Sequence, residues 1–142
     1  MKRFVFRLQT NLDIAEGQEK LAIEQLALKI SERDIINEQL KLKIDKLKRL
    51  EDSFKYKSFK EALLINDYLP VLRAHILEIN FELKKAEEKV EIARNILIEC
   101  KKETKTLTKL KEKEWKAYLN ELNIEEQKEI DEIAINKHFR NN

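Results

Sequence analysis

The second half of the chain carries one continuous stripe of apolar residues, spaced alternately three and four positions apart. It covers fourteen positions from Ala62 to Leu107, and thirteen of these are apolar, with Thr104 as the exception. This spacing keeps one side of an α-helix turned towards a partner helix, which is typical of a coiled coil. We call these positions the seam: Ala62, Ile65, Leu69, Leu72, Ile76, Ile79, Leu83, Ala86, Val90, Ala93, Leu97, Cys100, Thr104 and Leu107.

Two places can hold the turn between the helices. Pro70 could open the second helix, because proline is tolerated in a first helical turn. Ser58 and Glu61 instead form a capping box, in which both side chains satisfy free backbone N–H groups. The seam already runs in phase before Pro70, which favours Ser58. We therefore place the turn at residues 54–57 and interpret Pro70 as a kink, whose lost hydrogen bond costs about 3 kcal/mol.

The pattern predicts an all-α fold: a long two-helix antiparallel coiled-coil hairpin with a longer second helix. Residues 1–142 would form a single coiled-coil domain. We expect helices over about residues 5–53 and 58–138. A break is expected near Asn123, where Asn-Ile-Glu-Glu resembles another cap.

Reflecting the second helix about residue 56 predicts the partner positions of the first helix. Ten of these fourteen positions are apolar. The fourteen predicted positions are Leu8, Leu12, Ala15, Glu19, Ala22, Leu26, Lys29, Arg33, Ile36, Leu40, Lys43, Leu47, Leu50 and Phe54. In this register Ile36 lies beside Ile76, and Leu107 lies beside Val5. The helix beyond about residue 108 should then project as an unpaired segment.

A second set of apolar residues on the first helix lies outside this register. Its members recur every seven residues, flanked by Ile23, Ile30 and Ile44. Exposed apolar patches usually mark interfaces, so this docking ridge could receive another helix or subunit. The alternative is that the assumed phase is wrong and the ridge is core. The docking ridge consists of Ile14, Leu21, Leu28, Ile35 and Leu42.

The projecting segment also keeps large apolar side chains. Aromatic residues dominate binding hot spots, so they are candidate interface anchors. The alternative is a local fold-back onto Phe4 and Phe6. The residues are Trp115, Tyr118, Leu119, Leu122, Ile130, Ile133, Ala134 and Phe139.

The composition argues against an enzyme. One glycine in 142 residues excludes a Gly-rich phosphate loop. Cys100, His75 and His138 are too few for a zinc site with four ligands, and one cysteine forms no internal disulfide. We predict no catalytic residue, metal or cofactor. No apolar run approaches the roughly 18 residues that cross a bilayer, so we expect a soluble cytoplasmic protein.

Charge is nearly balanced overall, at +2, but not locally. Residues 41–60 hold eight basic and three acidic side chains, whereas residues 121–132 hold six carboxylates against Lys128. Basic stretches can bind nucleic acid or acidic lipid, although a Lys-rich helix is more often a solvated face. Lysine outnumbers arginine about three to one, which disfavours base-specific nucleic-acid contacts.

Motifs at both ends resemble one family. The opening, Phe4-x-Phe6-Arg7-Leu8-Gln9-x-x-Leu12, resembles the start of the FliJ flagellar export proteins, which group with the YscO proteins of injectisomes. The closing stretches Leu110-Lys111-Glu112-Lys113-x-Trp115 and Glu129-Ile130-Asp131-Glu132-Ile133-Ala134, with Phe139, resemble the end of that family. Ser58-x-x-Glu61 followed by Tyr68, Leu72 and Ile76 is similar to the start of its second helix. Pro70 departs from the pattern.

The resemblance implies a non-enzymatic part similar to the central stalk of rotary ATPases. Such a protein would bind the hexameric export ATPase, promote its assembly and activity, and link it to the membrane export gate. It would also handle export chaperones and lie at the inner face of the cell membrane, at the flagellar base. The ATPase-binding candidates are Phe4, Phe6, Trp115, Leu119, Leu122, Ile130, Ile133 and Phe139. The gate-binding candidates are Tyr68, Lys55 and Lys57.

Three other functions remain open from the residues alone. A generic coiled-coil scaffold needs nothing beyond the seam. A chaperone-like hairpin of the prefoldin type would need strands between its helices, and the turn offers only a few residues. A nucleic-acid-binding hairpin would show strong salt-dependent retention on DNA.

Overall fold

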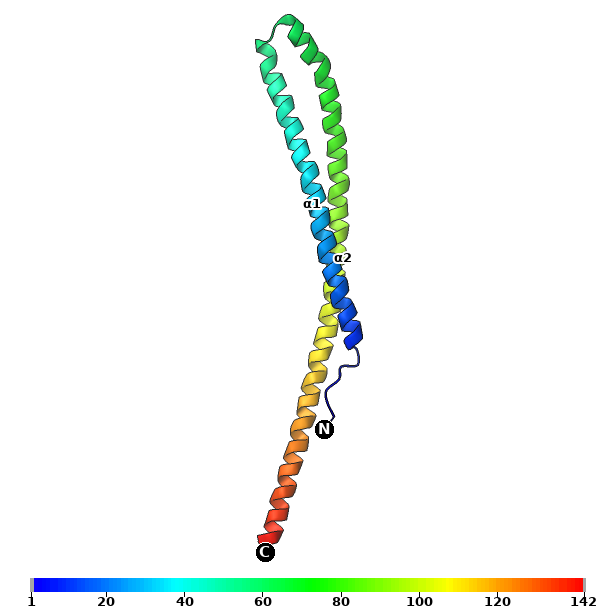
Figure 1. Cartoon of the computed structure of the whole chain (residues 1–142), viewed down its shortest axis with the longest axis vertical. Helices are drawn as coiled ribbons and strands as arrows, with labels where there is room; N and C mark the ends of the chain where they lie inside the picture. The colour runs from blue at the N-terminus through cyan, green and yellow to red at the C-terminus, as the bar shows by residue number, and fades with distance from the viewer. Residues whose placement is uncertain (1, 142) are drawn as a thin grey trace. The chain divides into compact units, whose positions relative to one another are not determined.

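The computed structural model describes residues 2–141, which form two long helices joined by a short turn (Figure 1). Helix α1 spans Gln9–Ser53, a 3₁₀ turn (η1) spans Phe54–Tyr56, and helix α2 spans Phe59–Asn141. No strand occurs among these described residues. The predicted all-α antiparallel hairpin with a longer second helix is confirmed.

The turn lies where the capping box predicts it. The Ser58 hydroxyl accepts a hydrogen bond from the Glu61 backbone N–H at 3.3 Å, and the Ser58 carbonyl accepts one from the Ala62 N–H at 2.8 Å. Pro70 lies inside α2, so a helix start at the proline is excluded. The kink at Pro70 stays a prediction.

Two predicted boundaries are wrong. The first helix begins at Gln9 rather than near residue 5, because residues 2–6 are not helical. The expected break near Asn123 is absent, and α2 continues to Asn141, just past the predicted end at 138. Glu, Gln, Lys and Leu surround Asn123 and all favour the helix, so one weak helix former does not end it.

The chain divides into two compact units. Met1–Glu19 and Glu99–Asn142 form the first, which we call the terminal unit. Lys20–Ile98 forms the second, the hairpin unit, which contains the turn. Both helices run through both units. The single domain expected from the sequence stays a prediction.

The seam forms the core of the hairpin unit. Every seam position from Ala62 to Leu97 is buried or half-buried, and Leu72 is the least exposed of all at 1%. The predicted partner positions from Ala22 to Leu50 are sheltered in the same way, whereas Phe54 remains 39% exposed. Each large apolar side chain buried there contributes roughly 1.5–3 kcal/mol, so the seam is the main stabilising feature of this unit.

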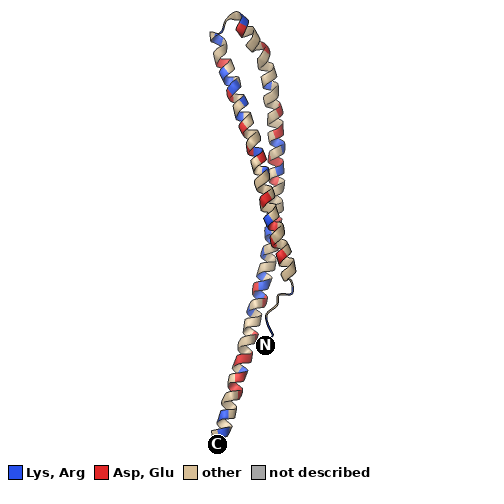
Figure 2. Cartoon of the chain, viewed as in Figure 1, with Lys and Arg blue, Asp and Glu red and all other residues tan. Residues whose placement is uncertain are grey.

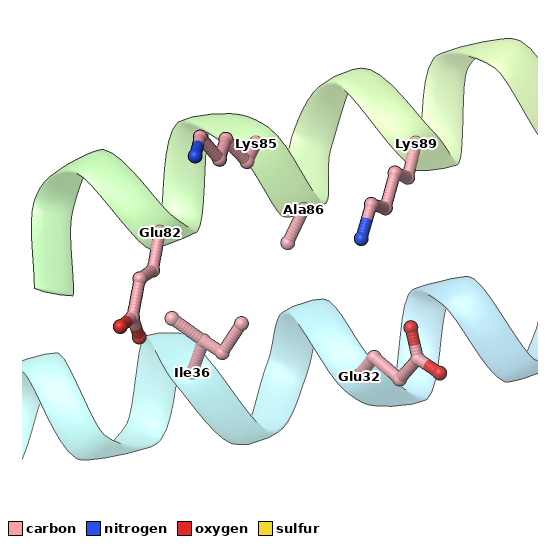
Figure 3. Close-up of a pocket in the computed structure, with 6 residues that line it drawn as sticks. All are labelled: Glu32, Ile36, Glu82, Lys85, Ala86 and Lys89. Carbon is pink, nitrogen blue, oxygen red and sulfur yellow. The ribbon is translucent and has the colours of Figure 1, made fainter.

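The register along the seam differs from the prediction. A groove of about 200 Å³ between the helices is lined by Ile36 and Glu32 of α1 and by Glu82, Lys85, Ala86 and Lys89 of α2. Figure 3 shows Glu82 beside Ile36. Glu82 lies six residues beyond Ile76, about 9 Å at 1.5 Å per residue. The predicted pairing of Ile36 with Ile76 is therefore wrong.

The asymmetry of the turn explains this shift. Phe54–Tyr56 form a 3₁₀ turn that follows α1, whereas Lys57 and Ser58 on the other side of residue 56 are not helical and α2 begins at Phe59 (Figure 1). A reflection about residue 56 assumes a symmetric turn. Because the seam repeats every seven residues, a shift of about one heptad leaves the same positions buried. Burial was therefore predictable, and register was not.

Within residues 2–141, the helices contain no segment long and apolar enough to cross a membrane.

Candidate interaction surfaces

In the terminal unit, residues 2–8 form a non-helical strap that packs on α2. The Phe4 ring lies 5.0 Å from the Trp115 ring, edge-on, and 5.4 Å from the Tyr118 ring. Trp115 and Tyr118 stack on each other at 5.5 Å. Each such aromatic pair adds about 0.5–1.5 kcal/mol beyond its buried area. The fold-back alternative considered for these aromatics is thus confirmed.

Phe6 and Gln9 fasten the strap to the helices. Phe6 is only 4% exposed, which makes it part of the core rather than a free binding residue. The Lys111 ammonium donates a hydrogen bond to the Gln9 side-chain oxygen at 2.6 Å. Val5, which the reflection placed on the seam, is instead 78% exposed. The strap therefore anchors through Phe4 and Phe6.

The strap shelters α2 further than predicted. Half-buried positions continue past residue 108 to Lys111, Glu114, Tyr118 and Leu122. An extended chain advances up to about 3.3 Å per residue against 1.5 Å in a helix, so a few non-helical residues cover several turns of α2. The prediction that the helix loses its cover at about 108 is wrong.

Beyond Leu122 the helix is exposed throughout. Every residue from 123 to 141 is solvent-exposed, including Ile130 at 58%, Ile133 at 67% and Phe139 at 75%. Trp115 and Leu119 also remain partly accessible, at 43% and 38%. We call the following residues the C-terminal apolar face, since their helical spacing places them on one side of α2: Trp115, Leu119, Leu122, Ile130 and Ile133.

The sequence reasoning missed two exposed apolar residues in the same segment. Ile124 and Ile135 are 49% and 53% exposed, and with Phe139 they lie on a different side of the helix. The same signal, a large apolar residue without a predicted cover, would have found them. Residues 121–132 carry six carboxylates, and Figure 2 shows acidic residues along this part of α2.

In the hairpin unit, Tyr68 and Lys46 join the two helices near the turn. The Lys46 ammonium donates a hydrogen bond to the Tyr68 hydroxyl at 2.9 Å and lies 5.1 Å from the centre of its ring. This hydrogen bond, with the positive charges of Lys46 and Lys43, lowers the pKa of the Tyr68 hydroxyl below its usual value. Tyr68 thus has a structural partner, while its side chain stays 37% exposed. Lys55 and Lys57, the other gate candidates, are exposed.

The docking ridge on α1 is exposed rather than core. Its members are 49–63% exposed: Ile14, Leu21, Leu28, Ile35 and Leu42. Of the flanking residues, Ile23 is exposed at 48%, while Ile30 and Ile44 are half-buried. The alternative that the ridge is core is therefore wrong.

These surfaces offer apolar contact and charge rather than reactive groups. Within the part of the chain that the structure describes, no three His, Cys, Asp or Glu side chains gather in a way that could hold a metal ion. A shallow apolar groove of about 310 Å³ lies on the strap, lined by Phe4, Lys111, Glu112 and Trp115. The geometry fits binding to other macromolecules.

A comparison with family models decides between the classes of binding protein. The model described as "Flagellar FliJ protein" matches residues 4–142, nearly the whole chain. The chain belongs to the FliJ family. The resemblance expected from the terminal motifs is thereby confirmed, and FliJ proteins are non-catalytic components of the flagellar protein export apparatus. Neither a search of curated proteins nor a search of solved structures finds a match.

Proposed function

We propose that this FliJ protein is a stalk that binds the hexameric export ATPase through its terminal unit and promotes ring assembly and ATP turnover. The observation that carries the proposal is the exposed stretch of α2 from 123 to 141 together with the accessible part of Trp115 and Leu119. Removing apolar side chains from water is favourable, so binding of a partner that covers them has a favourable free energy. Covering several at roughly 1.5–3 kcal/mol each is enough for micromolar binding.

The exposed fractions change the list of proposed ATPase-binding candidates. Phe6 leaves the list because it is buried, and Phe4 acts mainly by holding Trp115 and Tyr118. Ile124 and Ile135 join it on the second exposed side of the helix. The other candidates are Trp115, Leu119, Leu122, Ile130, Ile133 and Phe139.

The hairpin unit would contact the membrane export gate. The support is the exposed basic pair Lys55 and Lys57 at the turn, with the partly exposed Tyr68 further along α2 in the same unit. The protein would then act in the cytoplasm, at the inner face of the membrane beneath the flagellar base. The exposed docking ridge leaves room for a further helical partner, for which export chaperones are the class implied by the family.

Co-purification with the export ATPase of the same organism tests the proposal. A tagged full-length chain should retain the ATPase, and a mixture of the two should form hexameric rings at lower ATPase concentration than the ATPase alone. Charge-neutral changes on the docking ridge, such as Leu21→Ala with Leu28→Ala, serve as the matched control because they lie on the hairpin unit. If the chain neither retains the ATPase nor affects ring formation, the proposal is wrong and a coiled-coil scaffold is the function that remains.

A further inference from the structure

The turn end of the hairpin unit combines exposed aromatic and aliphatic side chains with lysines. We define the hairpin tip as residues 54–64, within which Tyr56 is 87% exposed and Phe59 is 81% exposed. Leu63 and Leu64 add 50% and 66% exposed side chains on the first turns of α2. Neither the seam nor the contact of Lys46 with Tyr68 uses these residues. The family's ATPase-binding role leaves them unexplained.

Within the hairpin tip, basic side chains outnumber acidic ones. Lys55, Lys57 and Lys60 are all exposed, and Glu61 is the one carboxylate between residues 54 and 64. Two carboxylates precede the tip: Glu51 is paired with Arg73 at 3.1 Å, and Asp52 is exposed. Figure 2 shows basic residues on the last turns of α1 leading into the turn. Lys48 and Arg49 are among them, about one Debye length away at physiological salt.

We propose that the hairpin tip binds directly to an anionic lipid surface, inserting Tyr56 and Phe59 among the headgroups while its lysines contact lipid phosphates. Aromatic rings favour the boundary between headgroups and acyl chains, because one edge is apolar and the polar end stays hydrated. Lysines on such a segment extend their ammonium groups to the phosphates and keep their aliphatic stems in the apolar layer. Each lysine near an anionic surface strengthens binding about fivefold.

The observations favour lipid over nucleic acid and over an acidic protein. Nucleic acid binds positive side chains through its phosphates and stacks its bases on aromatic rings. Neither contact uses exposed aliphatic side chains such as Leu63 and Leu64. An acidic protein surface would pair with the lysines alone, whereas the exposed aromatic and aliphatic side chains of the tip need an apolar layer beside the anionic one. A membrane surface takes up protruding apolar and basic side chains together.

This proposal does not depend on binding to the export gate, because it needs lipid alone. The test is flotation of the full-length chain with vesicles of phosphatidylcholine, or of phosphatidylcholine mixed with phosphatidylglycerol, without any other protein. A Tyr56→Trp variant made together with Trp115→Phe reports insertion, since its emission shifts to the blue when the indole leaves water.

Matched variants separate charge from apolar insertion. Lys55→Glu, Lys57→Glu and Lys60→Glu together should weaken binding to anionic vesicles more than a hundredfold, at three lysines of about fivefold each plus the added repulsion. The same reversal at Lys101, Lys105 and Lys109, which are exposed on the terminal unit, changes net charge equally and should weaken it less than tenfold. Tyr56→Ser with Phe59→Ser should weaken binding by tenfold or more, with the helical circular dichroism unchanged. Phe59→Ser added to the Tyr56→Trp, Trp115→Phe reporter should reduce the blue shift.

Three outcomes would overturn the proposal. Equal flotation with neutral and anionic vesicles would remove the role of the lysines. Equal losses for the tip and control reversals would reduce the effect to overall charge. Retention on duplex DNA with no flotation would identify the tip as a nucleic-acid surface instead.

Discussion

The two units cover the same helix in different ways. In the hairpin unit, α1 and α2 each present a stripe of apolar side chains, and residues such as Leu72 disappear between them. In the terminal unit, the first turns of α1, with Leu12 and Ala15 buried, are joined by a strap of non-helical chain that is fixed by Phe4 and Phe6. The strap contacts Trp115 and Tyr118, and α2 beyond Leu122 is exposed although it keeps its isoleucines. The same helix is thus paired along its seam in one unit and exposed at its end in the other.

The largest expected effect comes from breaking the seam of the hairpin unit. Leu72→Ala should lower the free energy of unfolding by about 3–4 kcal/mol, since it removes a fully buried side chain and leaves a cavity. Leu77→Ala removes the same atoms from a side chain that is 70% exposed, and it should cost less than about 0.5 kcal/mol. Urea unfolding followed by circular dichroism measures both. Equal losses would show that the seam phase is wrong.

Breaking the strap should have a smaller and more local effect. Phe6→Ala should cost about 3 kcal/mol and release the strap from α2. The emission of Trp115 should then shift to the red as Phe4 leaves its ring, and hydrogen exchange should rise in residues 9–19 but not in the hairpin unit. Val5→Ala is the matched control because Val5 is exposed. An unchanged Trp115 spectrum in Phe6→Ala would contradict the strap.

A designed disulfide sharpens the register of the hairpin unit. With Cys100→Ser to remove the native thiol, Ile36→Cys should cross-link with Leu83→Cys, the seam residue next to Glu82, and stabilise the unit by about 2 kcal/mol. Ile36→Cys with Ile76→Cys should not cross-link, because those residues lie too far apart along the helix axis. Non-reducing electrophoresis after mild oxidation gives the result. Preferred cross-linking to position 76 would restore the symmetric turn.

The smallest effect is expected from the ion pair near the turn. Arg73 and Glu51 join α2 to α1 at 3.1 Å, but their side chains are 56% and 43% exposed. A double-mutant cycle with Arg73→Ala and Glu51→Ala should give a coupling of about 0.5 kcal/mol that falls in high salt. A coupling above about 2 kcal/mol would mean that this pair, rather than the seam, holds the turn end together.

Some of this was predictable from the sequence because it depends on local pattern. The spacing from Ala62 onwards identified the buried face of α2, and Ser58 with Glu61 identified its first turn. The exposure of the docking ridge follows from the same phase, since a helix with one partner cannot bury two faces.

The missed features depend on distances that the pattern does not contain. A seven-residue repeat maps onto itself, so it cannot report whether Ile36 faces Ile76 or Leu83. The packing of the strap on α2 was only an alternative in the sequence analysis. Residues 2–8 have no helical periodicity, and the aromatic partners of Phe4 are more than a hundred residues away in the chain. Asn123 resembled a cap because capping motifs are short. Four residues do not distinguish the start of a new helix from the interior of a continuing one.

Stimulation of the export ATPase tests the central claim most directly, that the exposed part of the terminal unit is the ATPase-binding element. ATP turnover would be measured with increasing amounts of the full chain, of a chain ending at residue 122, and of Ile130→Ala with Ile133→Ala. Both the truncation and the isoleucine variant leave the strap contacts of Trp115 intact. Tyr56→Ser with Phe59→Ser, in the hairpin unit, is the control. The account predicts that the full chain and the control stimulate ATP turnover and that the truncated chain does not. The isoleucine variant should need about a hundredfold more protein for the same stimulation, because each buried isoleucine contributes roughly 1.5 kcal/mol or more to binding. Undiminished stimulation by both the truncated chain and the isoleucine variant would contradict it.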